Sequence, residues 1–213
     1  MPATCARSLV VAAILVASTS YLFAQSAVRT PEDHLADLLL WGADTSPAIT
    51  GLPPELQQAV DRFRLQWDGY RSVEPRPSGP EMGMVFDARV RYERRLAAIG
   101  TGPNVGALAR AYVAALRPCY EWEGFHECPE REALFADSYQ AEHLNGPFAQ
   151  YLPLLSAHRW LCAAEAYHYE GVVADERRSR HAYERALEVA GSSAVLLVRT
   201  AAQALKRRGR CFP

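Results

Sequence analysis

The stretch from Pro147 to Gly191 constrains the fold of this chain more than any other. Apolar, small and aromatic side chains recur there at steps of three and four residues, which is the spacing of one helix face. In the first half the positions at these steps are Leu154, Leu155, His158, Leu161, Cys162, Glu165, His168 and Tyr169, with Trp160, Ala163, Ala164 and Tyr167 on the neighbouring face. A helix that is apolar over so much of its circumference is buried on more than one side. We therefore expect two antiparallel helices, 148–170 and 175–190, with a kink or restart at Pro153.

These two helices carry a resemblance to a known repeat. In the first helix the matching positions are Trp160, Ala163, Ala164 and Tyr167, and in the second they are Tyr183, Ala186 and Leu187. In that spacing, residues 157–191 resemble one tetratricopeptide repeat, with alanines in place of the usual Leu and Gly. The chain departs from the pattern in the longer step between Tyr167 and Tyr183, and in Gly191, where a proline is common. The resemblance implies a helical-hairpin solenoid that binds proteins; the alternative is an ordinary antiparallel helix pair.

The rest of the chain is also predicted to be helical. Thr30 followed by Pro31 and two acidic residues is a strong helix start, and no segment alternates as a strand does. The apolar patterns predict about eight helices with short connections, so the fold class is all-α. The helices can be paired as 55–70 with 84–99, 104–117 with 129–144, and 148–170 with 175–190. This gives either an irregular solenoid of hairpins or a compact helical bundle.

The first 24 residues are expected to lie outside the fold. Arg7 precedes an apolar run over 9–17, and Ala24 is a suitable residue before a cleavage point, as in a secretory signal peptide. The alternative, an uncleaved membrane anchor, is disfavoured because the run is short for a bilayer span. We expect a single helical domain over 25–213, exported to the periplasm or outside the cell, with no membrane span after cleavage.

Charge argues against two classes of partner. Removal of the leader takes one arginine and no acidic residue, which leaves 22 basic against 24 acidic side chains. A chain so close to neutral has no general attraction for nucleic acid or anionic lipid. No nucleic-acid partner is therefore expected.

Four cysteines remain after the leader, and an even count in an exported protein indicates two disulfides. We expect Cys119–Cys128, which closes a short segment after a helix, and Cys162–Cys211, partly by elimination and partly because Gly209 lets the tail turn back. Zinc binding by Cys119, His126 and Cys128 is the alternative, but this spacing is unlike known zinc sites, and export favours oxidation.

The segment between Cys119 and Cys128 mixes aromatic and acidic residues. Tyr120, Trp122 and Phe125 on a closed loop would make a recognition surface, since aromatic anchors dominate binding energies at interfaces. The alternative is that Trp122 and Phe125 fill the gap between helices 104–117 and 129–144.

Glu165 and His168 are the candidate metal ligands. Their Glu-x-x-His spacing on a helix recurs in carboxylate-bridged di-metal bundles, which require a second such pair on another helix. The only other pair is Glu123–His126, inside the cysteine loop. His143, His158 and His181 are scattered over separate helices, and neither a phosphate-binding loop nor an HExxH motif is present. No cofactor is therefore expected.

The sequence favours a non-catalytic helical scaffold that binds a protein or peptide partner. The alternative is an exported hydrolase or metal-dependent enzyme that uses histidines and acids of the central helices. A deep pocket in which Glu165, His168, His158 and His181 converge would indicate the enzyme. An open groove lined by exposed aromatic side chains would indicate the binding protein.

Overall fold

The computed structural model describes residues 29–42, 49–119, 122 and 124–212, and within them the protein is entirely helical. The all-α prediction is thus confirmed, with eight helices and no strand in the described part of the chain. The helices are α2 (Pro31–Trp41), α3 (Pro54–Gly69), α4 (Pro80–Ile99), α5 (Val105–Leu116), α6 (Glu127–Glu142), α7 (Leu152–Glu170), α8 (Val173–Gly191) and α9 (Leu196–Arg208). The expected leader, residues 1–24, lies outside the described residues.

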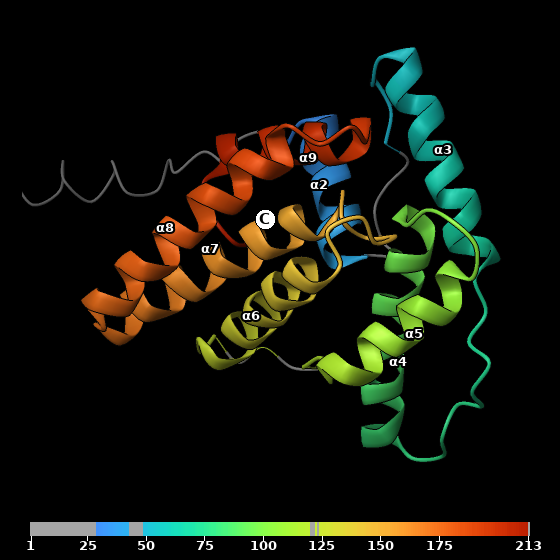
Figure 1. Cartoon of the computed structure of the whole chain (residues 1–213), viewed down its shortest axis with the longest axis horizontal. Coiled ribbons are helices and arrows are strands. Elements are labelled where there is room, and N and C mark those ends of the chain that lie inside the picture. Colours follow the sequence, from blue (N-terminus) through green and yellow to red (C-terminus); the bar gives the residue numbers. More distant parts are fainter. Residues whose placement is uncertain (1–28, 43–48, 120–121, 123, 213) are drawn as a thin grey trace, which may run out of the picture.

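Helix α7 is the centre of the molecule. It packs along α8 on one side and α6 on another, and it also contacts α2 and α9 (Figure 1). From Leu152 to Tyr167 every side chain except Glu165 is buried. Ala157, Ala163 and Ala164 are fully buried, because their small side chains let neighbouring helices approach. The expectation of a helix buried on more than one side is met.

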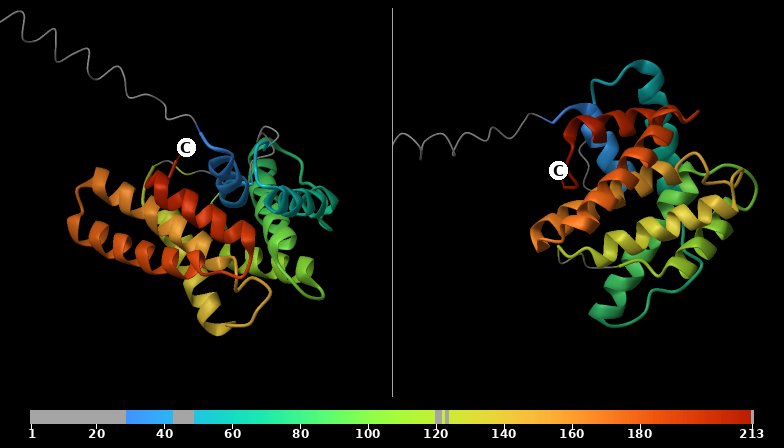
Figure 2. Two further views of the ribbon diagram at one scale, coloured as in Figure 1. Left: turned by 90° about the horizontal axis from the view of Figure 1, so that it is seen from above. Right: turned by 60° about the vertical axis from the view of Figure 1, so that its left-hand side comes forward.

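The helices form two groups, with one pair of helices between them. Figure 1 shows α3, α4 and α5 together on the right, with α6, α7 and α8 on the left. Helices α2 and α9 lie against each other between the two groups, as the view from above in Figure 2 also shows. One hydrophobic cluster contains buried residues from all eight helices and joins the two groups.

The pairing of helices differs in part from the expectation. Helix α3 packs on α4, and α7 on α8, as predicted. Helix α5, however, packs along α4 instead of forming a hairpin with α6. It meets α6 through aromatic side chains, since the Tyr112 ring lies edge-on to Phe135 and Tyr139 at 4.9 and 4.8 Å between ring centres.

The central helix also starts later than expected. Residues 147–151 form turns, and α7 begins at Leu152, with Pro153 in its first turn, where a missing N–H costs no helical hydrogen bond. The preceding turns are anchored in the core: Phe148 and Tyr151 are buried, and the Tyr151 hydroxyl donates to the Leu39 carbonyl at 2.6 Å. Of the two outcomes expected at Pro153, a kink or a restart, the structure has the restart.

None of the helices in the described part of the chain combines the length and the apolar character that a bilayer span needs.

Candidate functional site

A cavity of about 400 Å³ opens where the C-terminal tail crosses α7. Its walls come from the loop before α6, from α7 and α8, and from the tail that follows α9. The aromatic side chains that line it are Trp122, Phe125, Tyr169 and Phe212, and the polar ones are Glu165, His168, Arg180 and Arg210. Four residues singled out from the sequence, two loop aromatics and the Glu-x-x-His pair, therefore share one cavity.

The first disulfide closes the loop before α6, which forms one wall of the cavity. Cys119 is bonded to Cys128, with 6.0 Å between their Cα atoms, and the loop between them turns at Gly124, whose φ of +90° suits glycine. Trp122 is half-buried, whereas Phe125 is 57% exposed. Tyr120, the third candidate aromatic, lies outside the described residues.

Trp122 packs against side chains of α2, α7 and the C-terminal tail. Its ring lies edge-on to Trp41 of α2 at 5.0 Å and to Phe212 of the tail at 6.4 Å. The guanidinium of Arg159 lies over the same ring at 4.7 Å. The alternative in which Trp122 and Phe125 fill a gap between helices 104–117 and 129–144 is therefore wrong, because the loop folds over α7 and α2.

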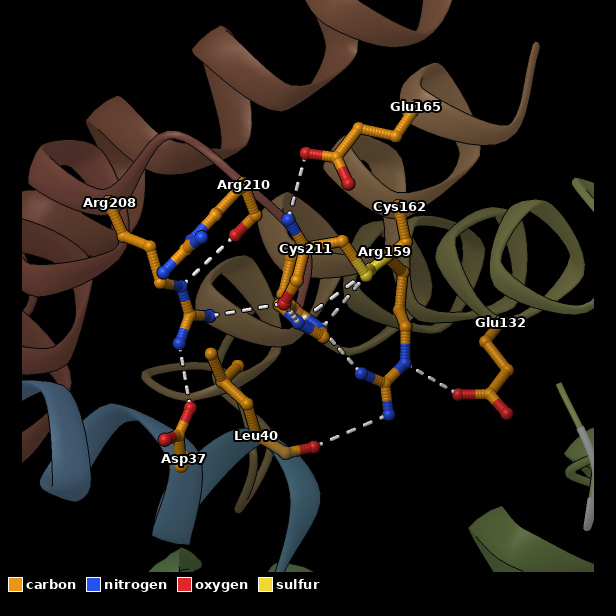
Figure 3. Close-up of a disulfide and its surroundings, with 10 residues drawn as sticks. Asp37, Leu40, Glu132, Arg159, Cys162, Glu165, Arg208, Arg210 and Cys211 are labelled. Carbon is orange, nitrogen blue, oxygen red and sulfur yellow. Dashed lines mark hydrogen bonds and ion pairs between the residues drawn. A yellow bond between two sulfur atoms is a disulfide. The ribbon is translucent and has the colours of Figure 1, made fainter. Parts of the chain in front are cut away.

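The second disulfide joins the C-terminal tail, which forms another wall of the cavity, to α7. Gly209 ends α9 in the left-handed conformation at φ +60°, and the chain turns back onto α7. Cys211 is bonded there to Cys162, with 4.8 Å between their Cα atoms, and Figure 3 shows the tail held beside this bridge. Both disulfides join the cysteines expected from the sequence.

Hydrogen bonds fix the tail at both ends of the turn. The backbone N–H of Cys211 donates to Glu165 Oε1 at 2.9 Å. Arg208 bridges the turn from the other side, since it donates to Asp37 of α2 and to the carbonyl oxygens of Arg210 and Cys211 (Figure 3). As a result, Arg210 and Phe212 are held at the cavity.

Glu165 and His168 do not face one another as a ligand pair would. Burial raises the pKa of the Glu165 carboxyl, while the Cys211 N–H and nearby arginines oppose that rise. His168 has a different partner, with Nδ1 at 3.2 Å from Glu176 of α8. The next residue, Tyr169, was expected on the inward stripe but is 86% exposed at the cavity rim.

The other histidines lie apart from the cavity. His126 pairs with Glu170 at 2.7 Å and stacks on Tyr167. Since Cys119 and Cys128 are bonded to each other, the zinc alternative for this loop has no thiolate to use. His143 stacks on Tyr139, and His181 lies exposed beside Glu184.

His158 lies beneath the cavity in a buried polar cluster that the sequence did not indicate. The guanidinium of Arg159 donates to His158 Nδ1 at 2.6 Å, so Nε2 must carry the proton that is donated to the Cys211 carbonyl at 3.1 Å. Arg159 also pairs with Glu132 at 2.7 Å, and both side chains are almost fully buried. Burial, followed by the charge of Arg159, holds the pKa of His158 well below its usual range.

His158, Cys162 and Cys211 are also the one group in the described chain whose potential ligand atoms cluster, within 4.8 Å of one another. The two sulfurs are joined in a disulfide, and both imidazole nitrogens are hydrogen-bonded. This cluster therefore holds the C-terminal tail against α7.

Arg180, Arg210 and Phe212 were missed as site residues. Once Cys211 is paired with Cys162, its two neighbours in the sequence must lie near Glu165, one helical turn away on α7. The expected disulfide was thus the signal that could have found Arg210 and Phe212. Arg180 lies on α8, and the sequence held no such signal for it.

No family model matches this chain, and no curated protein or solved structure is significantly similar to it. The resemblance of residues 157–191 to a tetratricopeptide repeat stays a prediction.

Proposed function

We propose that this protein is an exported, non-catalytic binding module that holds a peptide segment of a partner in the aromatic cavity. The observation that carries the proposal is the cavity itself, two of whose walls, the loop before α6 and the tail after α9, are each held by a disulfide. Its volume falls in the range of small-ligand sites, which are mostly apolar with a few placed polar groups. A helical-hairpin scaffold of the kind that tetratricopeptide repeats form would present such a site, by analogy of fold alone.

Exposed aromatic side chains support binding. Phe125, Tyr169 and Phe212 are 57%, 86% and 50% exposed, and all three line the cavity. Large apolar side chains gathered at one place on a surface mark interaction sites more often than isolated ones do. Aromatic groups also lose little conformational entropy on binding, which favours them as anchors.

The placement of the histidines favours binding over catalysis. Only Glu165 and His168 of the four residues considered for an enzyme line this cavity. His158 is fully buried and hydrogen-bonded at both nitrogens, and His181 lies on the outer face of α8. A general base needs hydrogen-bond reach to a substrate proton, and these two positions do not share a site with the cavity.

The proposal is tested by selecting short peptides on the mature protein with its disulfides intact, and by measuring their affinity by calorimetry. Selected peptides are expected to bind at about micromolar Kd. Phe125→Ser should weaken them by about tenfold, because it removes an aromatic anchor from the rim.

Leu65→Ser is the matched control. Leu65 is a large apolar residue, 75% exposed on α3 and away from the cavity. Its loss should leave peptide affinity unchanged. The proposal fails if no peptide is selected, or if the two substitutions weaken binding equally.

A further inference from the structure

The charges of the cavity are unequal. Among the described residues, two arginines, Arg180 and Arg210, line it, against one glutamate, Glu165. Arg208 lies just behind the wall, and the positive charges of all three arginines act on the Glu165 carboxyl. Since Arg180 is paired with Glu176 and Arg208 with Asp37, the positive charge among the described lining residues that no acid pairs with is that of Arg210.

Glu165, the one acidic residue among the described lining residues, already has a structural partner. Glu165 Oε1 accepts the backbone N–H of Cys211 at 2.9 Å, which ties the tail to α7 (Figure 3). Its side chain is half-buried between the disulfide and the tail. Glu165 is thus a structural acceptor that holds the wall in place.

The two lining arginines, in contrast, have donors that no described residue accepts. Arg180 uses Nε to bind Glu176 at 2.9 Å, which fixes the side chain and leaves its terminal nitrogens without a hydrogen bond in the described part of the chain. The Arg210 side chain is exposed and makes no hydrogen bond or ion pair with any described residue. A guanidinium with free terminal N–H groups matches a carboxylate in a two-pronged hydrogen bond.

The apolar lining gives the second requirement. Phe125, Tyr169 and Phe212 adjoin the arginines in the same small cavity. A ligand that satisfies both must carry an aromatic or large apolar group within a few bonds of an anion. In a peptide, the last residue does this, because its side chain and the terminal carboxylate share one Cα atom.

We propose that the cavity binds the free carboxyl terminus of a peptide that ends in an aromatic residue. Arg210, supported by Arg180, holds the carboxylate, and the aromatic wall holds the last side chain. The open rim at Phe125 and Tyr169 leaves room for the preceding residues to run out over the surface. This inference rests on the proposed peptide-binding function and adds the chemistry of the ligand.

The test compares two forms of one peptide, acetyl-glycyl-alanyl-phenylalanine with a free carboxylate and with a carboxamide end. Calorimetry on the disulfide-bonded protein should show the free acid binding about tenfold more tightly than the amide. Arg210→Gln should reduce that difference to less than about threefold, because the carboxylate loses its main partner. Arg207→Gln, an exposed arginine of α9 outside the cavity, should retain the full difference.

The outcomes separate this inference from the function on which it rests. If selected peptides bind the cavity but acid and amide forms bind equally, the carboxylate anchor is wrong and the peptide-binding function stands. The same holds if the acid preference survives in a protein carrying both Arg180→Gln and Arg210→Gln. If neither form binds and no peptide can be selected, both proposals are wrong.

Discussion

Arg159 carries a positive charge into the interior of the protein. It is satisfied there by Glu132, by the acceptor nitrogen of His158, and by the faces of Trp41 and Trp122 at 5.3 and 4.7 Å. A buried charge is tolerated only when it is paired and hydrogen-bonded in this way. Because the guanidinium can only donate, it also fixes His158 in the neutral form.

The neutral His158 predicts an acid-sensitive fold. Its folded pKa is depressed, whereas the unfolded side chain has its ordinary value near 6.5. Below that value the unfolded state takes up a proton that the folded state refuses, so the free energy of unfolding falls as the pH falls toward the folded pKa. This group alone should contribute a slope of up to about 1.4 kcal/mol per pH unit.

His158→Gln should remove that contribution, since glutamine does not titrate. Urea unfolding between about pH 7 and about pH 5, the range in which a histidine ordinarily changes charge, should therefore show a shallower decline than in the wild type. His181→Gln, which removes an exposed imidazole, is the control and should follow the wild type. Equal slopes for wild type and His158→Gln would show that this imidazole is not held neutral.

The sequence indicated individual residues of the candidate site but not that they line one cavity. Trp122 and Phe125 stood out because aromatics on a short cysteine-closed loop are unusual, and Glu165 and His168 because of their spacing. Their meeting in one cavity depends on how the loop folds over α7, and that is decided by contacts with Trp41 and Arg159 far away in the sequence. No local pattern records such contacts.

The helix boundaries and pairings were likewise predictable where nearby residues decide them, and not where contacts with distant residues do. Helix α2 starts where it was expected, because Thr30 and Asp33 cap it reciprocally and Pro31 follows. Helix α7 starts later than expected, because two prolines, Pro147 and Pro153, both suit a first turn and only core packing chooses between them. The predicted pairing of α5 with α6 was wrong for a similar reason, since α4 and α6 both have apolar faces against which α5 could pack.

The tail after α9 is the element that most depends on a single covalent bond. The Cys162–Cys211 bridge closes a segment with a sequence separation of 49, whereas Cys119–Cys128 closes one of 9. In the chain-entropy treatment, the longer loop should stabilise the protein by about 4 kcal/mol and the shorter one by about 2–3 kcal/mol. The two disulfides should thus contribute differently to the free energy of unfolding, although each holds one wall of the cavity.

We expect Cys162→Ala with Cys211→Ala to lower the free energy of unfolding more than Cys119→Ala with Cys128→Ala does. Urea unfolding of the two double variants at neutral pH measures both losses against the wild type. The reverse order, or no loss on removal of the tail bridge, would show that the tail is held by its hydrogen bonds to Glu165 and Asp37 without the disulfide.

For the molecule as a whole, one core and two disulfides act together. Every helix of the described chain contributes to the main hydrophobic cluster, and α7 runs through its middle. The two bridges use all four cysteines that follow the expected leader. Cys5, the fifth, lies within that leader. A chain that pairs its cysteines in this way is suited to an oxidising compartment, which agrees with export.

The proposed export predicts where the mature protein begins. Arg7, the apolar run over 9–17 and the small residue Ala24 together favour cleavage before Gln25. N-terminal sequencing of the protein produced with its own leader should therefore start near Gln25, and the denatured, unreduced protein should react with no thiol reagent, because Cys5 has left with the leader. Ala24→Arg should accumulate a heavier precursor, because a large charged side chain does not fit the small-residue cleavage site. Recovery of exported protein that still begins at Met1 and carries one free thiol would contradict the prediction and indicate that the apolar run serves as an anchor.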